Sequence, residues 1–242
     1  MPSQDKTGIL VITGGSRGIG FATVKAFIAQ GWTVINLSRT PCVWPEVINI
    51  IMDLTLLGQS QSPEGFPPVW QSLFYEKKRV VLVHNAGMFV PDTVSALSVA
   101  TTRVLFEVNV FAPMVLNEAL IPFMAEGSAI IYIGSTLSEK GVPETASYTS
   151  SKHAVVGLMK ATCQDLAKTG IHTCCICPGI TETEMLKTRC ENNPHLFETL
   201  SSLSTYGRLV QPEELAELIW FCAQHPVING AVIHGHLGQI ER

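Results

Sequence analysis

Charged side chains are scarce in this chain of 242 residues, since only 15% of them are Asp, Glu, Lys or Arg. The 16 basic residues are outnumbered by 20 acidic ones, so the formal net charge of −4 offers no basic surplus for nucleic acid. No uninterrupted apolar run approaches the roughly 18 residues of a membrane span. The N-terminal stretch from Met1 to Gly8 also lacks the apolar segment of a signal peptide. We therefore expect a cytoplasmic protein that binds neither nucleic acid nor membrane.

Metal-ligating and disulfide patterns are also lacking. The seven cysteines form no Cys-x-x-Cys pair, and Cys174, Cys175 and Cys177 crowd into one apolar run. Buried thiols are therefore expected rather than a disulfide framework or a zinc site. His234 and His236 alternate as residues on a strand would, but no third ligand lies nearby, so no metal site is expected.

Short apolar runs of strand character recur along the chain with helical stretches between them. The expected strands are Gly8–Thr13, Thr33–Ser38, Val47–Asp53, Arg79–Asn85, Ala129–Ser135, Ile171–Cys177 and Gly230–His234. The expected helices are Gly18–Gln30, Val69–Lys77, Ser98–Ala125, Ser147–Lys168, Glu184–Leu200 and Pro212–Ala223. Most strand runs are continuous rather than alternating, as in strands buried on both faces of a parallel sheet. The pattern predicts an α/β fold, with one domain over residues 1–242, a doubly wound parallel sheet of about seven strands and helices on both faces.

Two connections break this pattern. The link Arg39–Glu46 contains two prolines and is too short for the dozen or so residues of a usual parallel crossover. A tight loop or single turn is therefore expected there. The stretch Gly58–Pro68 is rich in Pro, Gly and Ser and predicts a second irregular loop.

A glycine-rich loop, from Thr13 to Gly20, follows the first expected strand and opens the first expected helix. Glycines allow a tight turn, and a helix N-terminus presents free N–H groups and the positive end of its dipole. This combination suits a pyrophosphate. The spacing Gly-x-x-x-Gly-x-Gly lacks the Gly-Lys-Ser/Thr of a P-loop, which disfavours a nucleoside triphosphatase.

The second expected strand ends in Ser38 and Arg39, where the adenosine ribose of a dinucleotide would lie. An acidic residue there would bind the 2′-hydroxyl of NAD, but no carboxylate is present. Arg39 and Arg17 are instead suited to clamp a 2′-phosphate. The sequence therefore predicts NADP(H) rather than NAD(H).

Tyr148 and Lys152 are spaced to share one face of an expected helix. A nearby cation favours the phenolate form of a tyrosine, which suits a general acid or base. Ser135 ends a buried strand, at the sheet edge where open α/β sheets place their ligands. Its hydroxyl is suited to hydrogen-bond a substrate oxygen.

Taken together, the chain resembles the classical short-chain dehydrogenases/reductases over nearly its full length. The matching motifs occur in order as Thr13–Gly20, Asp53-Leu54, Asn85-Ala86-Gly87, Asn109, Ser135, Tyr148-x-x-x-Lys152, Pro178-Gly179 and Thr183. The resemblance implies a Rossmann fold, a nicotinamide cofactor and hydride transfer to or from a small-molecule carbonyl or alcohol. Similar proteins usually assemble through their long central helices, so a homodimer or homotetramer is expected.

The resemblance also implies residue roles. Ser135 would polarise the substrate carbonyl, and Tyr148 would give its proton to the developing alkoxide. Lys152 would hold the nicotinamide ribose, and Asn109 would hold a water linking Lys152 to solvent. The expected cofactor-binding residues are Gly14, Ser16, Arg17, Gly18, Ile19, Gly20, Ser38, Arg39, Asp53, Leu54, Asn85, Ala86, Gly87, Tyr148, Lys152, Pro178, Gly179, Thr181 and Thr183.

The chain departs from the family pattern at three places. His84 stands where the family usually has an Asn, and little effect is expected. The short Arg39–Glu46 link omits the usual helix, which would leave the adenine pocket more open. The run Ile233–Gly238 replaces a common Asp-Gly-Gly in a segment that often packs near a subunit interface in the family.

The substrate site is expected between Thr136–Ala146 and a lid over residues 182–206, which is rich in apolar side chains. The main prediction is an NADP(H)-dependent oxidoreductase of the carbonyl reductase/alcohol dehydrogenase type. Two alternatives stay open: an NAD-dependent alcohol or sugar dehydrogenase, and a non-catalytic NADP-sensing regulator.

Overall fold

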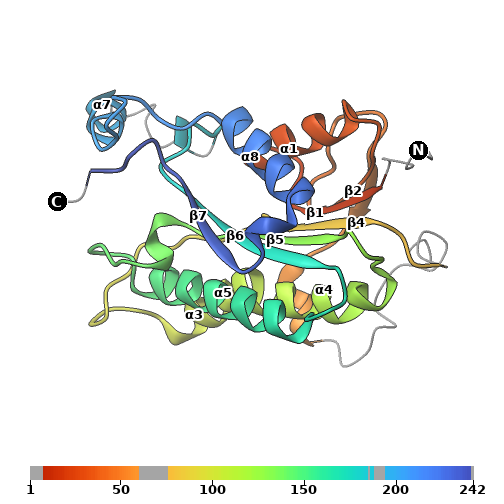
Figure 1. The fold of residues 1–242 in the computed structure, drawn as a ribbon. Coiled ribbons are helices and arrows are strands. Elements are labelled where there is room, and N and C mark those ends of the chain that lie inside the picture. Colours follow the sequence, from red (N-terminus) through yellow and green to blue (C-terminus); the bar gives the residue numbers. More distant parts are fainter. Residues whose placement is uncertain (1–7, 60–75, 185, 188–193, 241–242) are drawn as a thin grey trace.

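The computed structural model describes residues 8–59, 76–184, 186–187 and 194–240. Within these ranges a parallel sheet of seven strands forms the centre, and helices cover both of its faces, as predicted (Figure 1). The strands are β1 (Ile9–Thr13), β2 (Thr33–Ser38), β3 (Ile48–Ile51), β4 (Val80–His84), β5 (Ala129–Ile133), β6 (His172–Pro178) and β7 (Ala231–Gly235).

The order of strands across the sheet is β3-β2-β1-β4-β5-β6-β7. The chain therefore starts near the middle and winds outward twice, reversing between β1 and β4. Ile9 of β1 aligns with Thr33 on one side and Val80 on the other, both in parallel. Because every strand points the same way, all carboxyl ends lie at one edge, and the reversal marks where such sheets bind ligands.

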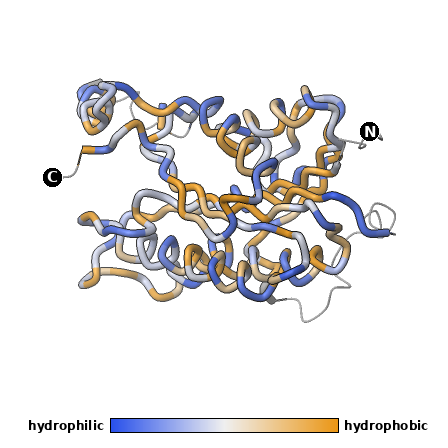
Figure 2. Tube along the Cα trace, viewed as in Figure 1, coloured by the Kyte–Doolittle hydropathy of each residue, from blue (hydrophilic) through white to orange (hydrophobic). Residues whose placement is uncertain are grey.

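Two hydrophobic cores flank the sheet. α1 (Gly18–Ile28) and α8 (Pro212–Gln224) cover one face, and α3 (Val99–Phe106), α4 (Ala112–Leu120) and α5 (Ala146–Asp165) cover the other (Figure 1). Successive strand residues point to opposite faces, so Leu10 joins the first core and Val11 joins the second. Both are fully buried, which explains the continuous apolar runs. Figure 2 shows hydrophobic residues concentrated along the strands at the centre.

The long central helix expected over Ser98–Ala125 is interrupted. A π-helical turn, Glu107–Phe111, separates α3 from α4, and a 3-10 turn, Ile121–Phe123, follows α4. Pro113 has no N–H to donate to the carbonyl four residues earlier, and its ring would clash with that carbonyl in a regular helix. The wider turn before it removes this conflict and brings Asn109 into the interior.

By length and composition, the helical run Val99–Phe123 could cross a membrane, with a mean hydropathy of 1.6 over its most apolar window. It is not an uninterrupted apolar run, because Arg103, Glu107 and Glu118 lie within it. A buried core helix meets the same criteria, and this run packs Leu116 and Leu120 against the sheet. Its composition therefore does not identify a membrane span.

The remaining elements refine the expected boundaries. The link 39–46 contains no helix, as predicted, and β3 is shorter than expected. α5 ends at Asp165 rather than Lys168, because Lys168 and Gly170 adopt positive φ angles of 66° and 75° that a right-handed helix excludes. The second irregular loop and most of the helix expected at 69–77 lie outside the described residues.

The helix expected over Glu184–Leu200 is described only in parts. Glu184, Leu186 and Lys187 are helical, and α7 spans Pro194–Ser201. Residues 185 and 188–193 lie outside the described residues, so the continuity of this helix stays a prediction.

Candidate active site and cofactor site

The glycine loop between β1 and α1 has room for glycine alone at its tightest points. Gly14 and Gly18 have positive φ angles of 69° and 53°. A Cβ added to Gly20 would lie 2.1 Å from the Gly14 carbonyl oxygen, far inside van der Waals contact. The loop therefore folds back on itself at the amino end of α1. Arg17 is the N-cap residue and makes no side-chain capping bond, so the first N–H groups of α1 keep their capacity to bind an anion.

Side chains from the neighbouring strands hold this loop. The Gly15 N–H donates to Asn36 Oδ1 at 2.8 Å. Asn85 Nδ2 donates to the carbonyls of Thr13 and Gly14 at 3.0 and 3.1 Å. Asn85 was predicted as a cofactor-binding residue, and these bonds show that it also supports the glycine loop. Asn36 was not predicted as a loop-holding residue, although an amide within a buried strand was a visible signal.

The segment after β6 reaches over the glycine loop. A Cβ on Gly18 would lie 3.1 Å from Thr183 Cγ2, so the Thr183 side chain packs closely against the Gly18 backbone. Glu182 N–H bonds to the Val210 carbonyl at 2.8 Å, which fixes the position just before Thr183. The structure therefore brings Thr183 together with the glycine loop, as expected for residues that share one cofactor.

Near the expected adenosine site, the ends of β2 and β3 carry charge and hydrogen bonds. Thr55 donates its N–H and hydroxyl to Asp53 Oδ1 at 3.0 and 2.8 Å. These bonds, with a smaller contribution from the Arg39 charge, hold the pKa of the Asp53 carboxyl below its usual value. Arg39 and Arg17 are exposed. Leu54 instead buries its side chain in the core beside the sheet.

Ser38 is buried and already occupied. Its hydroxyl donates to the Thr40 carbonyl and accepts from Asn36 Nδ2 at 3.2 Å. A hydroxyl has one hydrogen to donate, and here it is used within the loop. Contact with a phosphate through this hydroxyl would require the loop bond to open.

Tyr148 and Lys152 lie on α5 at the carboxyl edge of the sheet. The Lys152 ammonium is buried, lies 5.6 Å from the centre of the Tyr148 ring and donates to the Ile133 carbonyl at 2.8 Å. The expected proximity of cation and phenol is therefore present. The Lys152 side chain also ties the helix to the end of β5.

Ser135 follows β5 on the same edge. Its hydroxyl accepts from the Leu137 N–H, and its N–H donates to Ser138 Oγ, both at 3.1 Å. This pair of bonds caps a short 3-10 turn, Thr136–Ser138. The backbone of this turn thus holds Ser135 Oγ in place. No acceptor for the hydroxyl hydrogen of Ser135 is found among the described residues.

Asn109 projects from the π-helical turn into this region. Its Oδ1 accepts from the Met88 N–H at 2.7 Å, and its Nδ2 donates to the Met88 carbonyl and to Ser151 Oγ, both at 3.0 Å. A Cβ on Gly87 would lie 3.6 Å from Lys152 Nζ and 3.8 Å from Asn109 Oδ1. Gly87 therefore packs between the two side chains, and Asn109 joins the segment after β4 to α5.

Cys177 was expected only as a buried thiol, but its sulfur accepts a hydrogen bond from the Ser135 N–H. Hydrogen bonds from the Cys175 thiol, the Ser138 hydroxyl and the Ser135 N–H lower the pKa of the Cys177 thiol to about 6. The six cysteines in the described part of the chain are free, and all but Cys163 are buried. The prediction of buried thiols therefore holds except at the half-buried Cys163.

The histidines at positions where the chain departs from the family pattern have partners nearby. His234 Nε2 lies 2.8 Å from Glu139 Oε2, and the rings of His234 and His236 are 5.2 Å apart. His84 is buried and shares a hydrogen bond with Asn117 Oδ1 at 2.9 Å. His84 therefore belongs to a buried polar network, and its expected small effect stays a prediction.

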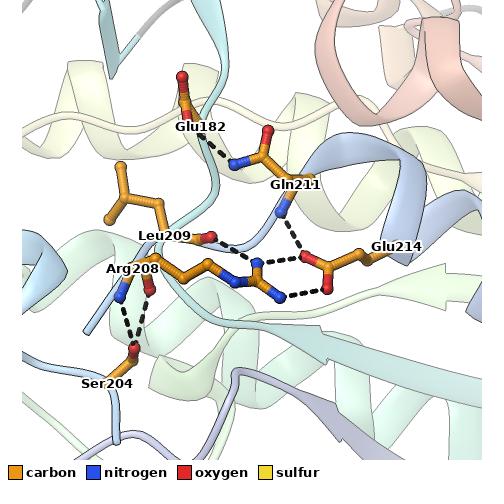
Figure 3. Close-up of polar contacts among 6 residues, drawn as sticks. All are labelled: Glu182, Ser204, Arg208, Leu209, Gln211 and Glu214. Atoms are coloured by element: carbon orange, nitrogen blue, oxygen red, sulfur yellow. Dashed lines mark hydrogen bonds and ion pairs between the residues drawn. The ribbon is translucent and has the colours of Figure 1, made fainter. Parts of the chain in front are cut away.

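A second network, drawn in Figure 3, fixes the base of the expected lid. Arg208 donates to both carboxylate oxygens of Glu214 at 2.8 and 2.7 Å, and Gln211 Nε2 donates to Glu182 Oε2 at 2.8 Å. The bidentate Arg208 bond and the Gln211 N–H lower the pKa of Glu214 to about 2. Residue 182 is thereby tied to the start of α8, which sequence reasoning did not foresee.

Comparison with known proteins agrees with this arrangement. The family model described as short chain dehydrogenase matches residues 8–194. This is more than half of the 242 residues, so the chain belongs to the short-chain dehydrogenase family, and we describe it as an oxidoreductase of that family.

Individual relatives cover most of the chain. It is 29% identical to a 3alpha-hydroxysteroid dehydrogenase of Mediterraneibacter gnavus, over 90% of each chain. It is 28% identical to the NADPH-dependent aldehyde reductase 2, chloroplastic, of Arabidopsis thaliana, over 95% of this chain and 93% of the relative. The ligand-free aldohexose dehydrogenase of Thermoplasma acidophilum superposes with a TM-score of 0.86 at 24% identity, covering 96% and 93% of the two chains. That structural likeness supports the fold.

Proposed function

We propose that the protein is an NADP(H)-dependent carbonyl reductase or alcohol dehydrogenase that acts on a small molecule. One observation carries the proposal: Ser135, Tyr148 and Lys152 lie at the carboxyl edge of the sheet, where the glycine loop also lies and where Lys152 donates to the Ile133 carbonyl at the end of β5. Polar and titratable groups gathered at such an edge are suited to chemistry on a bound cofactor.

The glycine loop is suited to a dinucleotide, because Gly20 leaves no room for a Cβ beside the Gly14 carbonyl and so lets the loop turn tightly at the amino end of α1. The first N–H groups of α1 would hold the pyrophosphate, and Thr183 would face the nicotinamide half. When bound, the nicotinamide supplies or accepts the hydride. The remaining chemistry falls to the residues of this chain.

During reduction, Ser135 Oγ would donate a hydrogen bond to the substrate carbonyl oxygen. Tyr148 would donate its phenolic proton to the same oxygen as negative charge develops there. The buried Lys152 ammonium would stabilise the resulting phenolate and hold the ribose of the cofactor. In the direction of oxidation, the proton transfer is reversed, and the Tyr148 phenolate would accept the proton of the substrate hydroxyl.

Preference for NADP(H) is supported by charge. Arg17 and Arg39 are both exposed cations beside the expected adenosine site. One of the relatives is named as an NADPH-dependent reductase. The Asp53 carboxylate partly offsets the Arg39 charge. The Ser38 hydroxyl already donates its hydrogen to the Thr40 carbonyl. The preference therefore depends on the two arginines.

The test is a panel of ketones, aldehydes and alcohols, followed by NADPH absorbance. The wild type should turn over at least one substrate. Tyr148→Phe should lower kcat at least a thousandfold while leaving the Kd for NADPH within about twofold, because it removes only the transferable proton.

Lys152→Met should lower kcat and also weaken cofactor binding. Lys160→Met is the matched control, because Lys160 is an exposed lysine further along α5. Full activity of Tyr148→Phe on a verified substrate would refute the proposed mechanism. A wild type that binds NADPH but turns over nothing in the panel would favour the sensing alternative.

A further inference from the structure

Phe89 lies between β4 and α3, close to the proposed proton donor. Its ring meets the Tyr148 ring edge to face, with centroids 5.1 Å apart and an angle of 76° between the planes. Its side chain is 38% exposed. A single exposed apolar residue is common on protein surfaces, so exposure alone means little. Phe89 differs from such residues because its ring lies beside the phenol of Tyr148, the proposed proton donor.

The backbone next to Phe89 is held on its amino side. Asn109 binds both the N–H and the carbonyl of Met88, at 2.7 and 3.0 Å. Asn109 is itself buried and bonded to Ser151 of α5. The backbone is therefore held in place one residue before Phe89.

The backbone is held again three residues later, at Asp92. Its carboxylate accepts the Ser147 N–H at 3.0 Å and the Ser147 hydroxyl. Its own N–H bonds to the Glu144 carbonyl at 3.1 Å, and its carbonyl accepts from the Ala146 N–H at 3.3 Å. The segment is thus fixed to the residues that start α5, immediately before Tyr148.

These two attachments fix the backbone on both sides of Phe89, and the Tyr148 ring contacts its side chain. A group fixed before binding loses little freedom when a ligand contacts it. The segment Met88–Asp92 carries no basic residue, and both oxygens of its one carboxylate are occupied by Ser147. It therefore offers apolar contact and no counter-charge for an anionic substrate.

We propose that Phe89 is a specificity-determining residue that contacts the carbon skeleton of the substrate and favours apolar, ring-bearing ketones or secondary alcohols. The inference rests on the proposed function. A carbonyl oxygen placed at Tyr148 and Ser135 brings the adjoining carbons beside the Phe89 ring. The two rings, with 76° between their planes, form a corner. A rigid ring system fills a corner with less loss of rotational freedom than a flexible chain.

The test compares 2-decalone, a fused-ring ketone, with 2-decanone, a linear ketone of the same carbon number. Phe89→Ala should lower kcat/KM for 2-decalone about tenfold, because the apolar contact between the Phe89 ring and the fused rings is lost, and for 2-decanone less than twofold. Phe89→Leu should fall between, and the KM for NADPH should not change. Phe221→Ala is the control, because Phe221 is 47% exposed on α8, across the sheet from Phe89.

An equal loss with both ketones, or no loss with either, would overturn the proposal. Direct binding keeps it separable from the proposed function. Calorimetric titration of 2-decalone into each protein saturated with NADP⁺ should show weaker binding to Phe89→Ala, even if the wild type turns over neither ketone. Equal ketone affinity of wild type and Phe89→Ala would remove Phe89 from the site, whatever the outcome for catalysis.

Discussion

Arg39 is the residue on which the choice of cofactor depends most. It lies exposed at the end of β2, and its positive charge contributes to the lowered pKa of Asp53. The nearby Ser38 hydroxyl donates to the Thr40 carbonyl, so it has no second hydrogen for a phosphate. A 2′-phosphate would therefore depend on arginine rather than on serine.

We expect Arg39→Ala to raise the KM for NADPH roughly tenfold or more, since a charged hydrogen bond is worth about 1.5 to 3 kcal/mol. The KM for NADH should change less than twofold, because NADH has no 2′-phosphate. Steady-state kinetics with both cofactors measures the two effects. Arg103→Ala is the control, since Arg103 is an exposed arginine on α3. Equal efficiency with both cofactors, unchanged in Arg39→Ala, would contradict the preference for NADP(H).

At the scale of elements, α5 is capped at its amino end by a residue from a distant segment of the chain. Thr145 is its N-cap residue and makes no side-chain capping bond. Asp92, from the segment after β4, supplies the missing acceptor to the Ser147 N–H at 3.0 Å. A carboxylate at this end also complements the helix dipole. The segment after β4 therefore helps to fix the start of α5 and with it the position of Tyr148.

Asp92→Ala should destabilise the protein by about 2 kcal/mol, because it removes a helix cap and leaves the backbone N–H of the buried Ser147 without its acceptor. Asp92→Asn should restore much of this loss, since its amide oxygen can still accept the N–H. Unfolding in urea measures both values. Asp165→Ala, at the last residue of α5, is the control and should change stability little or raise it slightly. A loss from Asp165→Ala as large as that from Asp92→Ala would argue against the capping role.

At the scale of the whole molecule, one buried polar network joins β4 and β5 of the sheet to α4 and α5, which cover the same face. His84 of β4 donates to Asn117 of α4, whose amide donates to Tyr132 of β5 at 2.6 Å. The Tyr132 hydroxyl in turn lies 3.0 Å from Thr162 of α5. Burial lowers the pKa of His84 from 6.5 to about 4, since the charged ring would lose its hydration.

This network predicts acid sensitivity. Between pH 6.5 and 4 the unfolded chain binds a proton at His84 that the folded protein does not, so stability falls as pH falls through this window. We expect His84 to account for a loss of about 2 kcal/mol between pH 7.5 and pH 5. His84→Asn should remove that part of the pH dependence in urea unfolding. The exposed His153→Gln is the control, and identical pH dependence of wild type and His84→Asn would refute this role.

The sequence by itself determined the seven-stranded parallel sheet, because continuous apolar runs can be buried only where both faces of a strand are covered. It also determined which residues follow each strand, and thus that Gly14, Ser135 and Pro178 share one edge. These properties depend on local composition and order along the chain.

Only the tertiary structure decided how these residues are held. Asn36 and Asn85 support the glycine loop, Asn109 fixes Met88, and Asp92 caps α5, each across many intervening residues. No local pattern encodes such pairs, because a hydrogen-bond partner is chosen by proximity in the folded chain. Tyr148 was visible in the sequence, but the Phe89 ring beside it became visible only when the strands were brought together.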